Sequence, residues 1–173
     1  KRCAHARSIE PANTTENDLA ARCSMRVRVL DWPIGTTAVL ALGGWSKTTI
    51  CAVSGQNVFV SEPIGDLDEG ATCQTLEQKI EWMCARYYVE PVVIAHDLHP
   101  DFFSMRLAQQ MARRRGIAAF GVQHHHAHIA AVCAEHGVTG TVLGLAMDGF
   151  GMGSDGQSWG GELLRVGPFD IDR

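Results

Sequence analysis

The chain has 173 residues, of which 46% are hydrophobic and 20% charged, and its formal net charge is -4. This length suffices for one domain or slightly more with a substantial core. The lack of a basic run argues against nucleic acid as the main partner. The sequence contains no apolar run of about 18 residues or more, so it predicts no membrane-spanning helix. It also contains no signal-peptide pattern.

The six cysteines include no CxxC pair, and their spacing shows no regular disulfide framework. Cys51, Cys84 and Cys133 fall within apolar patterns, which is typical of small core residues in a reducing compartment. We therefore expect a cytoplasmic protein.

Residues 1–37 carry no clear hydrophobic period, and a polar stretch is followed by an arginine-rich one. This composition predicts a poorly ordered linker or the remnant of a preceding region. The chain begins with Lys and stops a few residues after a predicted strand, so we expect a piece of a longer protein.

From Val39 the sequence predicts three short strands, joined by a Gly43-Gly44 turn and by a hairpin signal at 54–57. The first turn would bring backbone amides and Lys47 together, as a phosphate site requires. It lacks Walker spacing, however, and no helix follows it. A plain surface hairpin with a solvated lysine is the alternative.

An amphipathic pattern predicts a core-facing helix over 75–88, with Thr75 and Gln78 as a capping box. A buried strand is expected over 91–97, then a helix over 101–115 and another buried strand over 117–122. His96, Asp97 and His99 stand at the carboxyl end of the first of these strands. They are candidates for a site, although Asp97 or His99 could instead cap the next helix.

Alanines and a terminating Gly137 predict a helix over 123–136. His124 and His128, four residues apart, would then lie on one face, close enough to bind one ion. His125 shares its face with Ile129 and Val132, which favours a hydrogen-bonded packing role.

Asp148 follows a predicted strand over 141–147 and precedes a glycine loop. Ligands bind at such strand ends in α/β folds. With His124 and His128 it would form an open site of two histidines and one aspartate for iron or zinc. The alternative is that the histidine spacing is incidental.

The amides of Gly149, Gly151 and Gly153 would suit phosphate oxygens beside such a metal. A flexible hairpin loop explains the same glycines. A dinucleotide fingerprint is excluded, because a strand-like segment follows where a helix is required.

The order over 39–137 is three strands, helix, strand, helix, strand, helix, as in the ribonuclease-H-like unit. A second pattern of strand, glycine turn and strand follows, echoing the first. We therefore expect an α/β, actin-like (ASKHA, ribonuclease-H-like) lobe with a mixed sheet. Residues 38–140 would form this first lobe, and 141–173 the first hairpin of a truncated second lobe.

The chain also contains the segments AHDLHPDF, VQHHHAHIAAV and LGLAMDGFGMGSDGQSWGGEL. These closely resemble the HypF-type carbamoyltransferases of nickel-iron hydrogenase maturation, in their C-terminal Kae1-like domain. The resemblance covers about 39–166. More distant relatives are antibiotic O-carbamoyltransferases and the Kae1 proteins of tRNA threonylcarbamoyl-adenosine synthesis.

The resemblance implies metal ligands at His124, His128 and Asp148, completed by an aspartate of the second lobe. It implies that carbamoyl phosphate and ATP, with Mg²⁺, form carbamoyl-adenylate. The carbamoyl group then passes to the C-terminal cysteine of a HypE-like partner. Their strand-end position would let His96 and His99 orient that group or assist the thiol.

The sequence lacks the family's acylphosphatase region, paired CxxC zinc fingers and adenylating domain. Trp45 and Thr48 also depart from the family's GGxxKNT-like turn. The alternative to a carbamoyltransferase is therefore a non-catalytic remnant or module that binds metal or nucleotide.

Overall fold

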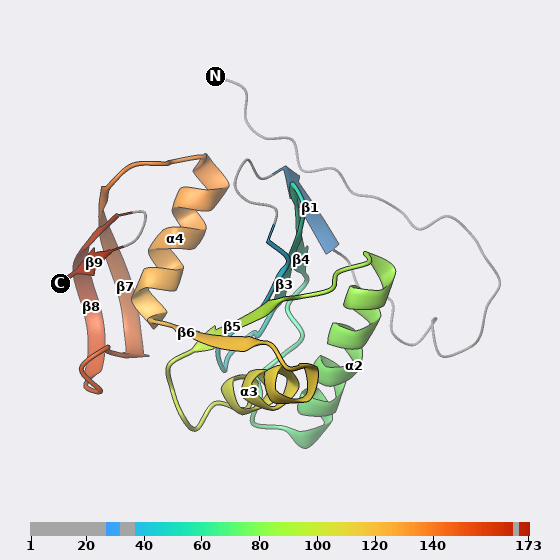
Figure 1. The fold of residues 1–173 in the computed structure, drawn as a ribbon. Coiled ribbons are helices and arrows are strands. Elements are labelled where there is room, and N and C mark those ends of the chain that lie inside the picture. The colour runs from blue at the N-terminus through green and yellow to red at the C-terminus, as the bar shows by residue number, and fades with distance from the viewer. Residues whose placement is uncertain (1–26, 32–36, 168–169) are drawn as a thin grey trace. The chain divides into compact units, whose positions relative to one another are not determined.

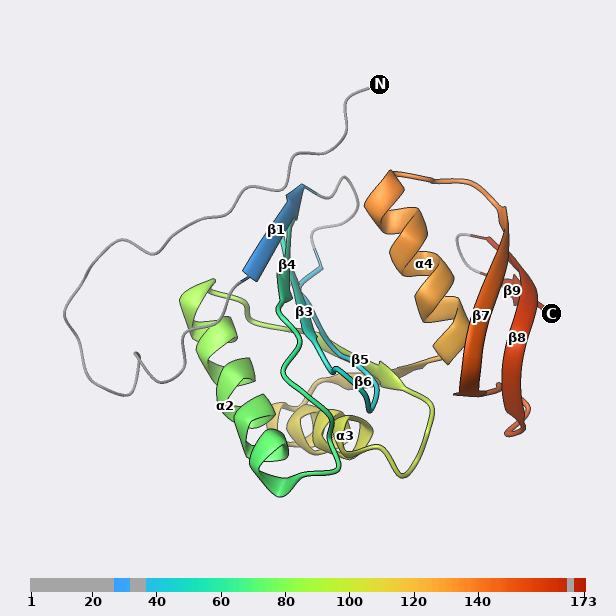
Figure 2. The same ribbon diagram turned by 180° about the vertical axis from the view of Figure 1, so that it is seen from behind.

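The computed structural model describes residues 27–31, 37–167 and 170–173 (Figures 1 and 2). They form two compact units. The first holds the described residues up to His96 together with 101–120, and the second holds 97–100 and the described residues from Gly121 onward. No helix in these ranges is long and apolar enough to cross a membrane.

The first unit is built on a six-stranded mixed sheet. Its strands, in spatial order, are β1 (Val27–Asp31), β4 (Asn57–Ser61), β3 (Ile50–Ser54), β2 (Val39–Leu42), β5 (Val93–Asp97) and β6 (Ala118–Val122). The central strand β2 pairs antiparallel with β3 and parallel with β5. The predicted α/β class and the predicted order of elements from Val39 onward are confirmed.

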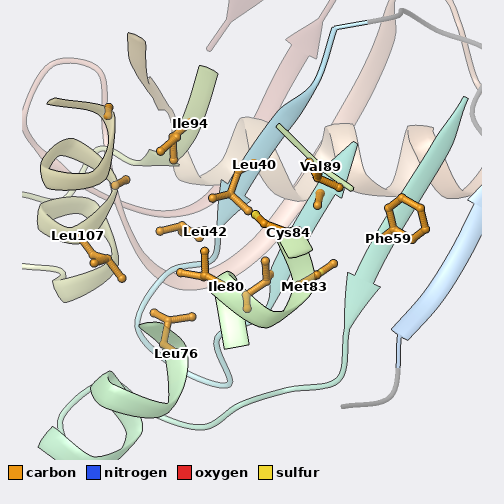
Figure 3. Close-up of a cluster of buried hydrophobic side chains, with 14 of the residues drawn as sticks. Leu40, Leu42, Phe59, Leu76, Ile80, Met83, Cys84, Val89, Ile94 and Leu107 are labelled. Atoms are coloured by element: carbon orange, nitrogen blue, oxygen red, sulfur yellow. The ribbon is translucent and has the colours of Figure 1, made fainter. Parts of the chain in front are cut away.

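Helices α2 (Gly70–Arg86) and α3 (Phe103–Arg115) pack on one face of this sheet. Leu40 and Leu42 of β2 project into the core because alternate residues of a strand share a face. Figure 3 shows them against Leu76 and Ile80 of α2 and Leu107 of α3. The apolar stripe predicted for α2 is therefore core.

Two local predictions for this unit are wrong. α2 begins at Gly70, and its N-cap Glu69 makes no side-chain cap hydrogen bond. The Thr75 hydroxyl instead donates to the Ala71 carbonyl within the helix, so Thr75 and Gln78 form no capping box. The predicted buried strand at 117–122 is β6, the last strand of the sheet among the described residues, and its Phe120 is 63% exposed.

Residues 27–31 lie within the segment expected to be a linker, yet they form strand β1. This strand pairs antiparallel with β4, from Val27 opposite Ser61 to Asp31 opposite Asn57. The pairing satisfies backbone groups that β4 would otherwise leave open at its edge. The rest of the expected linker, apart from Thr37, lies outside the described residues.

The second unit packs α4 (His124–His136) against a sheet of β7 (Val142–Met152), β8 (Ser158–Val166) and β9 (Ile171–Asp172). Ile129 of α4 lies in a small core with Ala146 and Leu164. A side chain at Gly144 would begin 2.4 Å from the Ile129 Cδ1 atom. This close packing explains why α4 joins the hairpin rather than the unit that the sequence had assigned to 38–140.

Candidate metal centre

Helix α4 presents His124 and His128 on one face, as their spacing predicts. The helix begins after the N-cap Gln123, whose side chain accepts a hydrogen bond from the His126 amide at 2.8 Å. It ends at Gly137, whose φ of 65° is a left-handed conformation that glycine adopts without strain. The two Nε2 atoms lie 3.2 Å apart.

Asp148 lies inside β7, not at the end of a strand as predicted. Met147 is opposite Gly161 and Gly151 is opposite Trp159, so four steps along β7 match two along β8. The extra residues form a bulge that contains Asp148. A bulge redirects the side chains that it carries, and bulges are frequent beside functional sites.

The bulge aims the Asp148 carboxylate at the two imidazoles. Its Oδ2 atom lies 2.7 Å from Nε2 of His124 and 3.3 Å from Nε2 of His128. Its Oδ1 atom accepts a hydrogen bond from the Gly149 amide. One ligand atom from each of the three residues falls within 4.8 Å of the others. Two imidazole nitrogens and one carboxylate oxygen fit a divalent iron or zinc ion with coordination positions left open.

Asp97 belongs to the same unit and holds His124 from the other side of the ring. Its Oδ2 atom lies 2.5 Å from Nδ1 of His124, and its Oδ1 atom accepts from the His99 amide at 2.9 Å. A proton on Nδ1 leaves the Nε2 lone pair free for a metal, and carboxylates commonly orient histidine ligands in this way. The N-cap of α3 is Phe102, without a side-chain cap, so the alternative that Asp97 or His99 caps this helix is wrong.

The charges of the cluster stabilise one another. Hydrogen bonding to Asp97 raises the pKa of His124 despite burial, and both Asp97 and Asp148 contribute by their charge. Burial alone would raise the pKa of Asp97 and of Asp148. Hydrogen bonds from His124 and the His99 amide lower it for Asp97, and the Gly149 amide and His124 lower it for Asp148. Without a metal, the arrangement therefore favours two carboxylates around a protonated imidazole.

The structure separates the two histidines predicted to take part in catalysis. His96 is buried on β5 in the first unit. His99 lies in the second unit, where its ring is 5.7 Å from the ring of Phe150, which follows Asp148 in the bulge. Of the pair, only His99 shares a unit with the three clustered residues.

The Lys47 turn lies in the first unit and is held by Asp66. The Asp66 Oδ1 atom accepts from the Lys47 amide at 2.7 Å and from the Ser46 hydroxyl at 2.8 Å. These hydrogen bonds lower the pKa of Asp66. The Lys47 amide is therefore already hydrogen-bonded to Asp66, whereas the Lys47 side chain is exposed. Binding of a ligand by that side chain stays a prediction.

Two of the three glycines predicted to bind phosphate, Gly151 and Gly153, are required by packing. A Cβ at Gly151 would lie 2.6 Å from Cε1 of His125, and one at Gly153 would lie 2.2 Å from Nε1 of Trp159. Gly149 has open space around its Cβ position, and its amide is bonded to Asp148. Binding of phosphate by these three glycines stays a prediction.

A groove of about 560 Å³ lies beside the cluster and was not foreseen from the sequence. His128 and Asp148 line it together with apolar residues of α4 and β7, among them Val132, Leu145 and Met147. The uninterrupted apolar run of β7 was the available signal. It predicted a strand over 141–147 without showing that its apolar side chains are exposed, and Leu145 is 64% and Met147 is 84% exposed.

Residues 35–135 match the family model described as the HypF Kae1-like domain. The carbamoyltransferase HypF2 of Cupriavidus necator is 53% identical over 129 residues, which are 75% of this chain and 16% of that protein. A probable carbamoyltransferase HypF of Methanocaldococcus jannaschii is 31% identical over 73% of this chain and 17% of its own length. The chain thus spans about a sixth of these relatives.

Two solved structures are similar. A crystal structure of full-length HypF in its phosphate- and nucleotide-bound form matches with a TM-score of 0.79 and 35% identity, over 84% of this chain and 23% of that one. The structure of HypF from T. kodakarensis matches with a TM-score of 0.71 and 33% identity, over 83% and 19%.

Proposed function

Because the chain belongs to the HypF carbamoyltransferase family, within its Kae1-like domain, we propose that it forms the part of the enzyme where the carbamoyl group is transferred. The donor would be carbamoyl-adenylate, made from carbamoyl phosphate and ATP. The acceptor would be the C-terminal cysteine thiolate of a HypE-like protein, in the maturation of nickel-iron hydrogenases. This chemistry belongs to a protein much longer than the present chain.

The convergence of His124, His128 and Asp148 is the observation that carries this proposal. These residues would hold an iron or zinc ion, which would supply Lewis-acid stabilisation to phosphate oxygens. Asp97 would keep His124 in the tautomer that binds, since its carboxylate faces Nδ1. The bulge of β7 would fix the direction of the Asp148 carboxylate.

The nucleotide would be bound by Lys47 and by the loop that carries Gly149, Gly151 and Gly153, with Mg²⁺ accompanying ATP. The nucleotide-bound state of the similar full-length HypF supports nucleotide binding by the whole protein, and the residues that bind it here are our proposal. His99, packed beside Phe150, would orient the carbamoyl group or assist the incoming thiol. We propose the same role for His96, which directly precedes Asp97 in β5.

The cytoplasm is the proposed location, because the four cysteines in the described ranges are free thiols, as expected in a reducing compartment. Nucleic acid is not proposed as a partner, in line with the net charge of -4.

A chimera tests the proposed function. The matching 129-residue segment of the Cupriavidus necator relative would be replaced by the segment from this chain. Carbamoylation of the C-terminal cysteine of a HypE-type acceptor would be followed by mass spectrometry. We expect transfer by the chimera, loss of transfer on Asp148→Ala, and retention on Asp172→Ala, which changes an exposed carboxylate of β9. A folded chimera that binds metal and nucleotide but transfers nothing would support a non-catalytic module instead.

A further inference from the structure

The Gln123 side chain uses both ends of its amide and is only 7% exposed. Its Oε1 atom accepts from the His126 amide at 2.8 Å. Its Nε2 group lies 2.9 Å from Nδ1 of His125 and donates to the Met152 carbonyl at 3.2 Å. The helix cap uses the first contact alone, so capping leaves the two contacts of the amide nitrogen unexplained.

The contact with Met152 joins the two elements that carry the metal ligands. Gln123 immediately precedes His124, and Met152 ends β7 beyond the bulge that contains Asp148. The amide of Gln123 therefore ties the start of α4 to β7. The two elements approach closely here, since a Cβ at Gly151 would lie 2.9 Å from the Cβ of His124.

The second contact of the amide nitrogen is with His125, which lies in the first turn of α4. Its ring is fully buried, and Nδ1 accepts from an amide nitrogen that can only donate, which assigns the ring proton to Nε2. That buried Nε2 has no hydrogen-bond partner. A buried imidazole that leaves one nitrogen unsatisfied is held by its remaining contacts, and the polar one comes from Gln123.

We propose that Gln123 is a positioning residue for the metal centre, setting the distance between the α4 histidines and Asp148. It would act through its two donated hydrogen bonds, to Met152 and His125, and not through its helix cap. This inference rests on the metal centre of the proposed function.

Gln123→Glu separates the two roles in the purified chain. Glutamate has the same shape and keeps an oxygen to cap α4, but it has no N–H to donate. The ionised carboxylate cannot restore the Met152 contact, because both it and the Met152 carbonyl accept. We expect Co²⁺ affinity, measured by competition with a chromophoric chelator, to fall about 10-fold or more, within the range seen when a group that orients ligands is lost. The visible absorption of the bound Co²⁺ should shift, since it reports ligand geometry.

Gly137→Ala is the matched control. It strains the other end of α4, at a φ of 65°, and leaves every contact of Gln123 in place. We expect its Co²⁺ affinity and spectrum to stay within a factor of two of the unchanged chain. Helix content by circular dichroism should be retained in both variants. If Gln123→Glu does not fold, Gln123→Ser keeps a favoured cap that is too short to reach Met152, and it replaces Glu in the test.

The outcomes distinguish the two proposals. Equal affinity and an equal spectrum in Gln123→Glu would overturn the positioning role and leave the metal centre intact. An equal loss in Gly137→Ala would also overturn it, because affinity would then follow helix stability. Failure of the unchanged chain to bind Co²⁺ would remove the metal centre itself, and the positioning role with it.

Discussion

The hairpins β2–β3 and β7–β8 share a sequence pattern but differ in what surrounds them. β2 pairs on both edges, and its Leu40 and Leu42 are 0% and 4% exposed. In the part of the chain that the structure describes, β7 pairs with β8 alone, and its Leu143 is 71% exposed. The first hairpin therefore contributes β2 to the main hydrophobic core, whereas the second packs against α4 and leaves many apolar side chains of β7 exposed.

The carboxylates that contact the two hairpins also differ, and the one that meets the first hairpin, Asp66, follows β4. Asp66 uses Oδ1 to hold the backbone and hydroxyl of the Lys47 turn. Asp148 uses Oδ1 for the neighbouring amide and leaves Oδ2 facing two imidazoles. The turn of the first hairpin thus meets a structural carboxylate from a later segment, whereas the second hairpin carries its own carboxylate in a metal-binding geometry.

The largest expected effect is on metal binding. Asp148→Ala should abolish stoichiometric metal, a loss greater than the roughly 100-fold seen when a group that orients ligands is removed. Asp66→Ala should leave metal content unchanged, because Asp66 accepts hydrogen bonds from Ser46 and Lys47 of the first unit and does not belong to the cluster of His124, His128 and Asp148. Metal analysis of both purified variants measures this. Equal metal content in Asp148→Ala and Asp66→Ala would contradict the claim that only Asp148 of these two carboxylates binds the metal.

The next largest effect is on the free energy of unfolding, which should depend on how deeply each hairpin's leucines are buried. Leu40→Ala should lower the free energy of unfolding by about 3 kcal/mol, because it leaves a cavity in a filled core. Leu143→Ala should change it by less than about 0.5 kcal/mol, because that side chain is already in solvent. Urea denaturation of both variants gives the numbers. A cost at Leu143 near that at Leu40 would show that β7 is covered in solution.

Asp97→Asn tests whether the Asp97 carboxylate orients His124 for metal binding. The asparagine oxygen can still accept from the His99 amide, but the negative charge facing Nδ1 of His124 is lost. We expect metal affinity to fall 10- to 100-fold, or about 1.4 to 2.7 kcal/mol. Calorimetric titration of Zn²⁺ checks this, with Asp68→Asn, an exposed carboxylate of the first unit, as control. Unchanged affinity would mean that His124 is oriented by helix packing alone.

The smallest effect should be equal in the two units. Gly116 ends α3 and Gly137 ends α4, with φ values of 66° and 65°. Alanine at either position should cost about 1 kcal/mol of stability, since a side chain disfavours the left-handed conformation. Thermal unfolding of the two variants compares them. A much larger cost at one end would reveal a contact specific to that helix.

Periodicity was sufficient to predict α4, its end at Gly137 and the shared face of His124 and His128. It did not locate the bulge around Asp148, because a bulge depends on the register between β7 and β8, which local sequence does not encode. The partnership of Asp97 with His124 joins residues 27 positions apart, so it too required the fold. The exposure of strand β6 was not predicted, because an apolar run has the same pattern in an edge strand and in a buried one.

X-ray absorption at the metal edge most directly tests whether α4 and β7 form a metal centre. The chain would be loaded anaerobically with Fe²⁺ or Zn²⁺, separated from free metal and compared with His128→Ala. We expect outer-shell scattering from two imidazoles in the unchanged chain and from one in the variant. A folded chain whose bound metal shows no imidazole scattering, or the same scattering in both proteins, would contradict the assignment of His124, His128 and Asp148 as ligands.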